Sequence, residues 1–441
     1  MALAHTPPIA APRDASSPAA PGGRPRSGTS GADRKTETGS TERETAEDGS
    51  ADPVRRRFRA RVHDDLATVA PAWRAMQADG ACTPYQRFAW VALVVEHLAA
   101  GVTPLFVEVL DTAAGRPVLI LPMVRIRRRT HTAVEWLDLG VSDYAAPVMA
   151  AGRALAADEA ARAWDAVRAV LPPADLIRIT RIPESVFGAP NPLARVGSAR
   201  PLALSSSGVA LVGDPDTLLR RVCTPSTVRD VAKRRRRLAE RGEVRFAAAA
   251  TETEVEAMFG TLLRQRRDRF HDMGRFDLLD RPEVTAFYRA AARRGLAEGS
   301  VRVFALTVGD EAIATAYGLV AGNTFHGVLL AMGGEAWRSF GPGIMIVSEI
   351  MVWARGQGMI ALDFTVGALP YKHSFRPTEH PLFEIAEART AIGHLVLGLA
   401  RVATGAKAFL ERHPATFERL RAGRQFARRL ANGARARLGR G

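Results

Sequence analysis

The segment between residues 324 and 375 contains most of the residues whose types and spacing suggest chemistry. An apolar stretch leads to the run Arg338-Ser-Phe-Gly341-Pro342-Gly343, which directly precedes an apolar stretch with helical spacing. Glycines let backbone N–H groups converge, and a helix start adds unpaired N–H groups and the positive end of its dipole. Together with the charge of Arg338, this pattern predicts a pyrophosphate site. The alternative is an ordinary strand-to-helix turn with Pro342 at the first helical position.

A second group of chemically suggestive residues follows that predicted helix. Asp363 ends an apolar stretch, and the carboxyl end of a strand is where α/β proteins bind ligands. Tyr371 comes eight residues later; an unperturbed tyrosine, with a pKa of ~10, is protonated at neutral pH and can donate a proton. Lys372 could stabilise an oxyanion or neutralise a phosphate. His326, in the middle of a predicted strand, is a candidate base, and the alternative is a structural histidine.

The elements that must position these residues occur in two similar sets. Each set has a hairpin of apolar strands, then a helix, then another apolar strand, which predicts layered α/β structure in two related domains. The first set comprises strands at 104–110 and 117–124, a helix at 158–171 and a strand at 175–180. The second comprises strands at 301–307, 312–320 and 324–331, a helix at 344–355 and a strand at 359–364.

The remaining segments connect or flank these two sets. Residues 1–53 are rich in Pro, Ala, Ser, Gly and Thr, with almost no large apolar side chains, and are predicted to be disordered. Apolar residues at helical spacing predict connecting helices at 216–241, 252–269 and 282–294. We therefore expect an N-terminal domain over 54–205, a C-terminal domain over 206–395 and a basic, amphipathic helical tail over 396–441.

Length and composition exclude several classes of protein. The chain has 441 residues, of which 47% are apolar, and no apolar stretch approaches the ~20 residues of a membrane-spanning helix. No secretory signal is recognisable. The two cysteines, Cys82 and Cys223, are too few for a disulfide scaffold or a cysteine zinc site. We expect a cytoplasmic protein that requires no metal.

Positive charge is concentrated in two places. The formal charge is +15, from 61 basic and 46 acidic residues. Residues 401–441 contain eleven Arg or Lys and only two acids, and residues 233–237 form a second basic block. This balance favours a polyanionic partner: nucleic acid, anionic lipid or a phosphorylated small molecule. The alternative is a GC-rich genome that encodes Arg where others encode Lys.

Several motifs resemble one family of acyltransferases. Asp363-Phe364, Gly367, Tyr371-Lys372 and Phe375 resemble the second domain of tandem-domain proteins in the GNAT acyltransferase superfamily. In the first half, residues 83–90 and 139–147 resemble the opening helix motif and the Gly-x-x-x-Asp-Tyr-x-x-Pro segment of the same branch. The branch comprises the BioF-like or CelD-like acetyltransferases, relatives of the Fem peptidyltransferases. The resemblance extends over residues 57–390.

This resemblance implies a fold and a role for each candidate residue. The fold would be two tandem GNAT-like domains, with a mixed central sheet flanked by helices and a splayed pair of parallel strands that binds an acyl thioester. The strand that contains Leu330 would hydrogen-bond the pantetheine arm and supply an N–H for the oxyanion. Arg338, Gly341 and Gly343 would hold the pyrophosphate, and Tyr371 would protonate the leaving thiolate. Asp363 and Lys372 complete the predicted catalytic group.

The resemblance also implies a reaction. We expect an N-acyltransferase that uses acyl-coenzyme A, in the simplest case acetyl-coenzyme A, to acylate a small-molecule amine such as an amino sugar or an envelope or exopolysaccharide precursor. One alternative is a Fem-like transferase that takes its donor from aminoacyl-tRNA. Another is a non-catalytic protein that docks on membrane or nucleic acid through the basic tail. A tail on an anionic membrane would place the protein at the inner face of that membrane.

Overall fold

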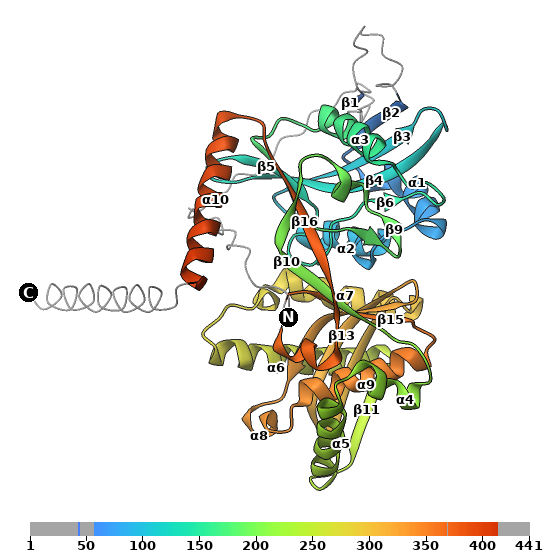
Figure 1. The fold of residues 1–441 in the computed structure, drawn as a ribbon, viewed down its shortest axis with the longest axis vertical. Coiled ribbons are helices and arrows are strands. Elements are labelled where there is room, and N and C mark those ends of the chain that lie inside the picture. The colour runs from blue at the N-terminus through green and yellow to red at the C-terminus, as the bar shows by residue number, and fades with distance from the viewer. Residues whose placement is uncertain (1–42, 45–56, 368, 413–441) are drawn as a thin grey trace, which may run out of the picture.

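The computed structural model describes residues 43–44, 57–367 and 369–412, which form two α/β lobes stacked along the long axis of the molecule (Figure 1). Most of the predicted disordered segment, 1–53, lies outside the described residues. The exception is β1 (Arg43–Glu44), which pairs with β2 (Phe58–His63). The part of the tail beyond residue 412 also lies outside them.

The N-terminal lobe is a sheet with helices on its faces. Its strands are β2, β3 (Thr103–Asp111), β4 (Arg116–Arg127), β5 (Thr132–Trp136), β6 (Val148–Met149) and β7 (Leu176–Pro183), with a small pair β8 (Ser185–Val186) and β9 (Ala189–Pro190). Its helices are α1 (Leu66–Asp79), α2 (Phe88–Leu98) and α3 (Ala157–Val170), with short 3-10 turns η2 (Pro84–Gln86) and η3 (Pro192–Arg195). The β5–β7 pair is parallel, because α3 connects the two strands as a crossover.

The C-terminal lobe repeats this plan. Its strands are β11 (Val244–Ala248), β12 (Val301–Val308), β13 (Glu311–Ala321), β14 (Thr324–Met332) and β15 (Ala361–Val366). Its helices are α4 (Pro215–Val222), α5 (Pro225–Ala239), α6 (Glu252–Asp272), α7 (Pro282–Glu298), α8 (Glu335–Arg338) and α9 (Pro342–Gly356), with 3-10 turns η4 (Leu278–Asp280) and η5 (Pro370–Phe375). The parallel pair here is β14–β15, connected through α9.

One predicted helix is divided in the structure. The sequence predicts a continuous helix over 216–241, but α4 ends at Val222 and α5 begins at Pro225. Pro225 has no N–H to continue a helix, and the Thr224 side chain accepts a hydrogen bond from the backbone N–H of Thr227 as the cap of α5. The prediction was therefore wrong at this break.

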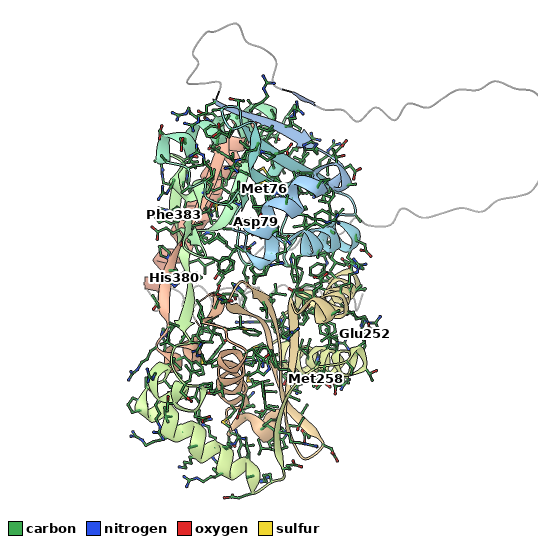
Figure 2. All side chains as sticks on the ribbon, turned by 90° about the vertical axis from the view of Figure 1, so that its right-hand side faces the viewer. Met76, Asp79, Glu252, Met258, His380 and Phe383 are labelled. Carbon is green, nitrogen blue, oxygen red and sulfur yellow. The ribbon has the colours of Figure 1, made fainter. Side chains whose placement is uncertain are left out.

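Two strands join the lobes into one continuous sheet. β10 (Ala199–Ala210) pairs with β15 in the C-terminal lobe through residues 206–210, and with β16 (Thr378–Ala388) along most of its length. β16 continues into the N-terminal lobe and pairs with β7. In Figure 2, His380 and Phe383 mark β16 as it passes from the waist of the molecule into the upper lobe. A division of the chain at residue 205 therefore cuts through β10.

A similar irregularity interrupts the second parallel strand of each lobe. In β7 and in β15 the register shifts by one extra residue, and each of these stretches includes a non-glycine residue with positive φ, Arg181 at 61° and Thr365 at 58°. The lobes differ beside this bulge. β5 ends one residue after its last pair with β7, whereas β14 continues from its last pair at His326 to Met332. Only the C-terminal lobe has a long, splayed strand.

The last described element is α10 (Ala391–Arg412), at the side of the molecule next to the end of β16 (Figure 1). It begins five residues before the helical tail expected over 396–441. Among the residues that the structure describes, no helix is both long and apolar enough to cross a bilayer.

Candidate active site

The splayed strands of the C-terminal lobe separate at a strained point. β14 and β15 pair only from Thr324 to His326, opposite Ala361 to Asp363. Just beyond, Thr365 has a φ of 58°, which is unusual for a β-branched residue and costs on the order of 1–3 kcal/mol. Its N–H donates to Asp363 Oδ1 at 2.7 Å and its hydroxyl donates to the carbonyl of Gly327 at 3.3 Å. These bonds hold the bulge at which the two strands diverge.

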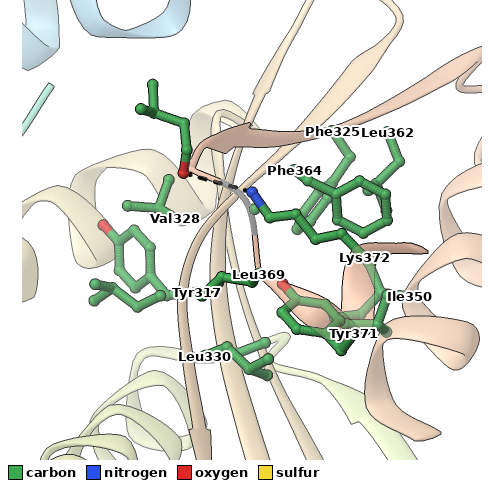
Figure 3. A pocket seen from close by; sticks show the side chains of 15 residues that line it. Tyr317, Phe325, Val328, Leu330, Ile350, Leu362, Phe364, Leu369, Tyr371 and Lys372 are labelled. Carbon is green, nitrogen blue, oxygen red and sulfur yellow. Dashed lines mark hydrogen bonds between the residues drawn. The ribbon is translucent and has the colours of Figure 1, made fainter. Parts of the chain in front are cut away.

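A cavity of about 40 Å³ lies between the diverging strands (Figure 3). Its lining includes Leu330 and Tyr371, both predicted site residues, and apolar side chains from α9. Figure 3 shows the Tyr371 hydroxyl directed toward the middle of this ring of side chains. Burial raises the pKa of Tyr371 to about 12, so the phenol stays protonated at neutral pH. We call this space the splay cavity.

Lys372 also lines the splay cavity, but its ammonium group donates its hydrogen bonds to backbone carbonyls. It is 2% exposed, and Nζ donates to the carbonyls of Thr365, Val366 and Gly367 at 3.3, 3.5 and 2.6 Å. Burial lowers the pKa of Lys372 to about 8, with nearby acids such as Asp363 acting in the opposite direction. In this geometry Lys372 fixes the end of β15. Its predicted role at the oxyanion stays a prediction.

Asp363 and His326 form a pair at the last paired position of the parallel strands. His326 Nδ1 lies 3.0 Å from Asp363 Oδ2. Burial acts to raise the pKa of the Asp363 carboxyl, but the hydrogen bond and charge of His326, with the Thr365 N–H, lower it overall. The carboxyl is therefore ionised and acceptor-only, so Nδ1 must carry the proton that they share.

This arrangement leaves the other imidazole nitrogen free to act as a base. Whenever the ring of His326 is neutral, the proton on Nδ1 leaves Nε2 unprotonated. His326 is 4% exposed, and its Nε2 has no hydrogen-bond partner among the described residues. A buried polar atom without a partner costs free energy and calls for an explanation. A substrate proton donor would supply that partner.

The N-terminal lobe completes this pair. The Tyr144 hydroxyl donates to both carboxylate oxygens of Asp363, at 2.9 and 2.8 Å, across 219 positions of sequence. Tyr144 is 6% exposed, and burial raises its pKa well above the ordinary range, so it stays a donor. Asp143, which precedes Tyr144 in the segment 139–147, accepts a hydrogen bond from Tyr85 at 3.1 Å instead.

Tyr144, His326 and Asp363 line a second, larger space between the lobes, which we call the interlobe cavity. Its volume is about 420 Å³. The rest of its lining is contributed by both lobes and is rich in hydroxyl groups: Thr83, Pro183, Glu184, Ser185, Val186, Phe187, Ser206, Gly208, Val209, Ala210, Thr324, Ala361, Leu362, Thr378 and His380.

The two cavities lie on opposite faces of β15. Successive side chains of a strand point to opposite faces, so Asp363 faces the interlobe cavity and Phe364 lines the splay cavity, while Leu362 contributes to the lining of both. The His326–Asp363 pair stands at the last paired position before the strands diverge. A group that enters the splay between the strands would therefore meet this pair at the inner end of the gap.

The predicted pyrophosphate site has the expected glycine geometry but few free amides. Gly341 adopts the left-handed conformation, with φ 60°, at the start of α9. The N–H groups of Phe340 and Gly341 donate to Trp337 and Arg338 carbonyls, and Pro342 has none. The amide of Gly343 remains, close to Met332, since a Cβ at 343 would lie 2.9 Å from its sulfur.

Arginines from α5 lie beside the start of α9, where few backbone amides are free. The Arg234 guanidinium lies so close to Gly341 that a Cβ there would overlap it. Arg237 lies over the Phe340 ring, 4.7 Å from its centroid. Arg338 is 76% exposed and pairs with Glu335 at 3.2 Å. The sequence showed the basic block 233–237 but gave no signal that it packs against α9.

Comparisons with known proteins identify the fold. Residues 225–373 match the family model described as an acetyltransferase (GNAT) domain. The structure of FemX aligns with a TM-score of 0.51 at 10% identity, over 72% of this chain and 95% of FemX. A domain of an Agrobacterium fabrum protein described as a lysylphosphatidylglycerol synthetase aligns at 0.48 and 14% identity, over 77% and 97% of the two chains. No curated protein matches the sequence.

The chain therefore has a GNAT fold, in a two-lobed arrangement like that of FemX. This confirms the predicted α/β fold of two tandem GNAT-like domains. The narrower BioF-like or CelD-like assignment stays a prediction.

The buried ammonium of Lys372 predicts a pH dependence of stability. The side chain of a lysine in an unfolded chain has a pKa of ~10.4. Between about pH 8 and that value, the unfolded chain keeps a proton that the folded chain has released. The free energy of unfolding should therefore rise with pH across this window, relative to a Lys372→Met variant, in urea titrations. Parallel pH profiles for the two proteins would contradict a buried lysine with a lowered pKa.

Proposed function

We propose that this protein is an N-acyltransferase that moves an acyl group from acyl-coenzyme A, in the simplest case acetyl-coenzyme A, to an amine held in the interlobe cavity. The observation that carries the proposal is the buried Nε2 of His326, for which the described part of the chain supplies no hydrogen-bond partner. It is oriented by Asp363 and lies where the donor and acceptor spaces approach each other. This is the arrangement of a base aligned by a carboxylate.

The donor would enter the gap between β14 and β15. From Leu329 to Met332, β14 still pairs with β13, and no described strand pairs with its edge toward β15. That edge offers backbone groups to an extended pantetheine arm and an N–H to the developing oxyanion. The small volume of the splay cavity suits a short acyl group at its inner end.

The acceptor would approach from the opposite face. Its amine would donate a proton to His326 Nε2 as its nitrogen attacks the thioester carbon, and Asp363 would stabilise the resulting imidazolium. Tyr144, through its two bonds to Asp363, would keep that carboxylate in place. The hydroxyl-rich lining supports a polar acceptor, and an amino sugar is one such amine.

Collapse of the tetrahedral intermediate would break the carbon–sulfur bond. The thiolate takes a proton, and Tyr371 is the acid that lines the splay cavity. A pKa of about 12 keeps this proton in place until a strong base forms beside it.

Replacing the proposed base should slow the chemical step. We expect His326→Gln to lower kcat by about 10²–10⁴-fold, the usual range for one acid–base group. The pH dependence of the rate should also lose the step caused by protonation of the base. Both effects are measured in a thiol-release assay with acetyl-coenzyme A and an amino sugar. His394→Gln, at an exposed position on α10, is the matched control. A fully active His326→Gln protein would remove His326 from the mechanism.

Loss of the proposed acid should affect poor leaving groups most. Tyr371→Phe keeps the ring but removes the phenolic proton, so kcat with acetyl-coenzyme A should fall by roughly 10²–10⁴-fold. The defect should shrink with an acyl donor whose thiol has a low pKa, because that thiolate leaves without protonation. Equal activity of the variant and the wild-type protein with acetyl-coenzyme A would exclude this role.

A second candidate donor is an aminoacyl-tRNA, favoured by the arginines that α5 places beside α9. If the donor is an acyl-coenzyme A, we expect acetyl-coenzyme A to bind the folded protein and so raise its Tm by mass action. Arg234→Ala should weaken that shift, whereas Arg236→Ala, at an exposed site on the same helix, should not. No shift with acetyl-coenzyme A, together with stabilisation by tRNA that falls steeply with salt, would favour the second donor.

A further inference from the structure

We propose that α10 binds the surface of a bilayer that contains anionic phospholipid, through an apolar stripe formed by Ile392, Leu395, Leu399 and Val402. This proposal is independent of the acyl-transfer chemistry, since it rests on a different part of the molecule. The stripe, the attachment of the helix and the charge of the following sequence carry the argument.

The stripe is an exposed apolar surface with helical spacing. Its four side chains are 49%, 62%, 63% and 71% exposed, in chain order. Their separations of three, four and three residues place them on one face of the helix. Of the ten large apolar side chains that are exposed among the described residues, four lie on this stripe. A contiguous apolar patch of this kind marks an interaction site more often than isolated exposed residues do.

The start of α10 is fixed to the N-terminal lobe so that the stripe faces away from it. Gly393 packs on the carbonyl of Asp175 so closely that a Cβ would overlap it. Thr390 reinforces this contact: its hydroxyl donates to Asp175 Oδ1 at 2.6 Å and accepts from the Gly393 N–H at 3.2 Å. Since residues 393 and 399 lie on different sides of the helix, this attachment holds the stripe toward solvent.

Charge complementarity identifies the partner. Residues 401–441 contain eleven Arg or Lys against Glu411 and Glu418. Cations of this density attract anionic phospholipid headgroups, while the stripe enters the acyl boundary below them. Nucleic acid would pair with the cations, but it offers no apolar region comparable to the acyl boundary in which four aliphatic side chains could be buried. A bilayer containing phosphatidylglycerol satisfies both features.

Vesicle flotation of the full chain tests the proposal. We expect binding to phosphatidylcholine vesicles that contain about 30% phosphatidylglycerol, much weaker binding to pure phosphatidylcholine, and a decrease as salt rises above about 0.15 M. The triple variant Leu395→Gln, Leu399→Gln, Val402→Gln should bind at least about tenfold more weakly. The matched control is Phe276→Gln with Ile360→Gln, which replaces side chains that are 67% and 54% exposed elsewhere.

Equal flotation of the triple variant and the wild-type protein would overturn the proposal, as would no flotation of the wild-type protein with anionic vesicles. A concentration-dependent dimer that the triple variant loses, without vesicle binding, would assign the stripe to a second copy of the chain and also overturn it. Circular dichroism of each variant establishes that it is folded, and the single variant Leu399→Gln repeats the test with less disturbance.

Discussion

The site and the contact between the lobes depend on one ionised, largely buried carboxylate, that of Asp363, whose side chain is 20% exposed. A carboxylate that has lost most of its contact with water is stable only when several hydrogen-bond donors surround it. Tyr144 from the N-terminal lobe, His326 from the neighbouring strand and the Thr365 amide are those donors. The same bonds link the two lobes at the site and orient the imidazole.

The length of β14 explains why, among the described residues, only the C-terminal lobe has a complete site. Both lobes contain a bulge with a positive-φ residue in the second parallel strand. β14 extends six residues beyond its last parallel pair, whereas β5 extends one, so the gap between parallel strands opens in the C-terminal lobe. β16 pairs with β10 and then with β7, and it brings the N-terminal lobe against the opposite face of β15, where the interlobe cavity forms. The first lobe thus acts as one wall of the acceptor space.

Structural features that depend on residues close together in the sequence could be predicted, whereas contacts between distant segments could not. Apolar stretches arranged as hairpins predicted the strands, and Gly341 and Asp363 were recognisable because a helix start and a strand end constrain their neighbours. The bond from Tyr144 to Asp363 joins residues 219 positions apart, and no periodicity encodes it. His326 was ambiguous for the same reason, since its partner follows from the pairing register of β14 with β15. The approach of Arg234 to Gly341 depends on how α5 packs against α9.

Nitrogen-15 NMR of histidine-labelled protein, with His326 identified through its substitution, measures directly which imidazole nitrogen is protonated. The account predicts that the neutral form of the ring carries its proton on Nδ1 and has an unprotonated Nε2 whose resonance shifts when an acceptor amine is added. A proton on Nε2 throughout, in the absence and in the presence of amine, would contradict the claim that Asp363 orients His326 as the base.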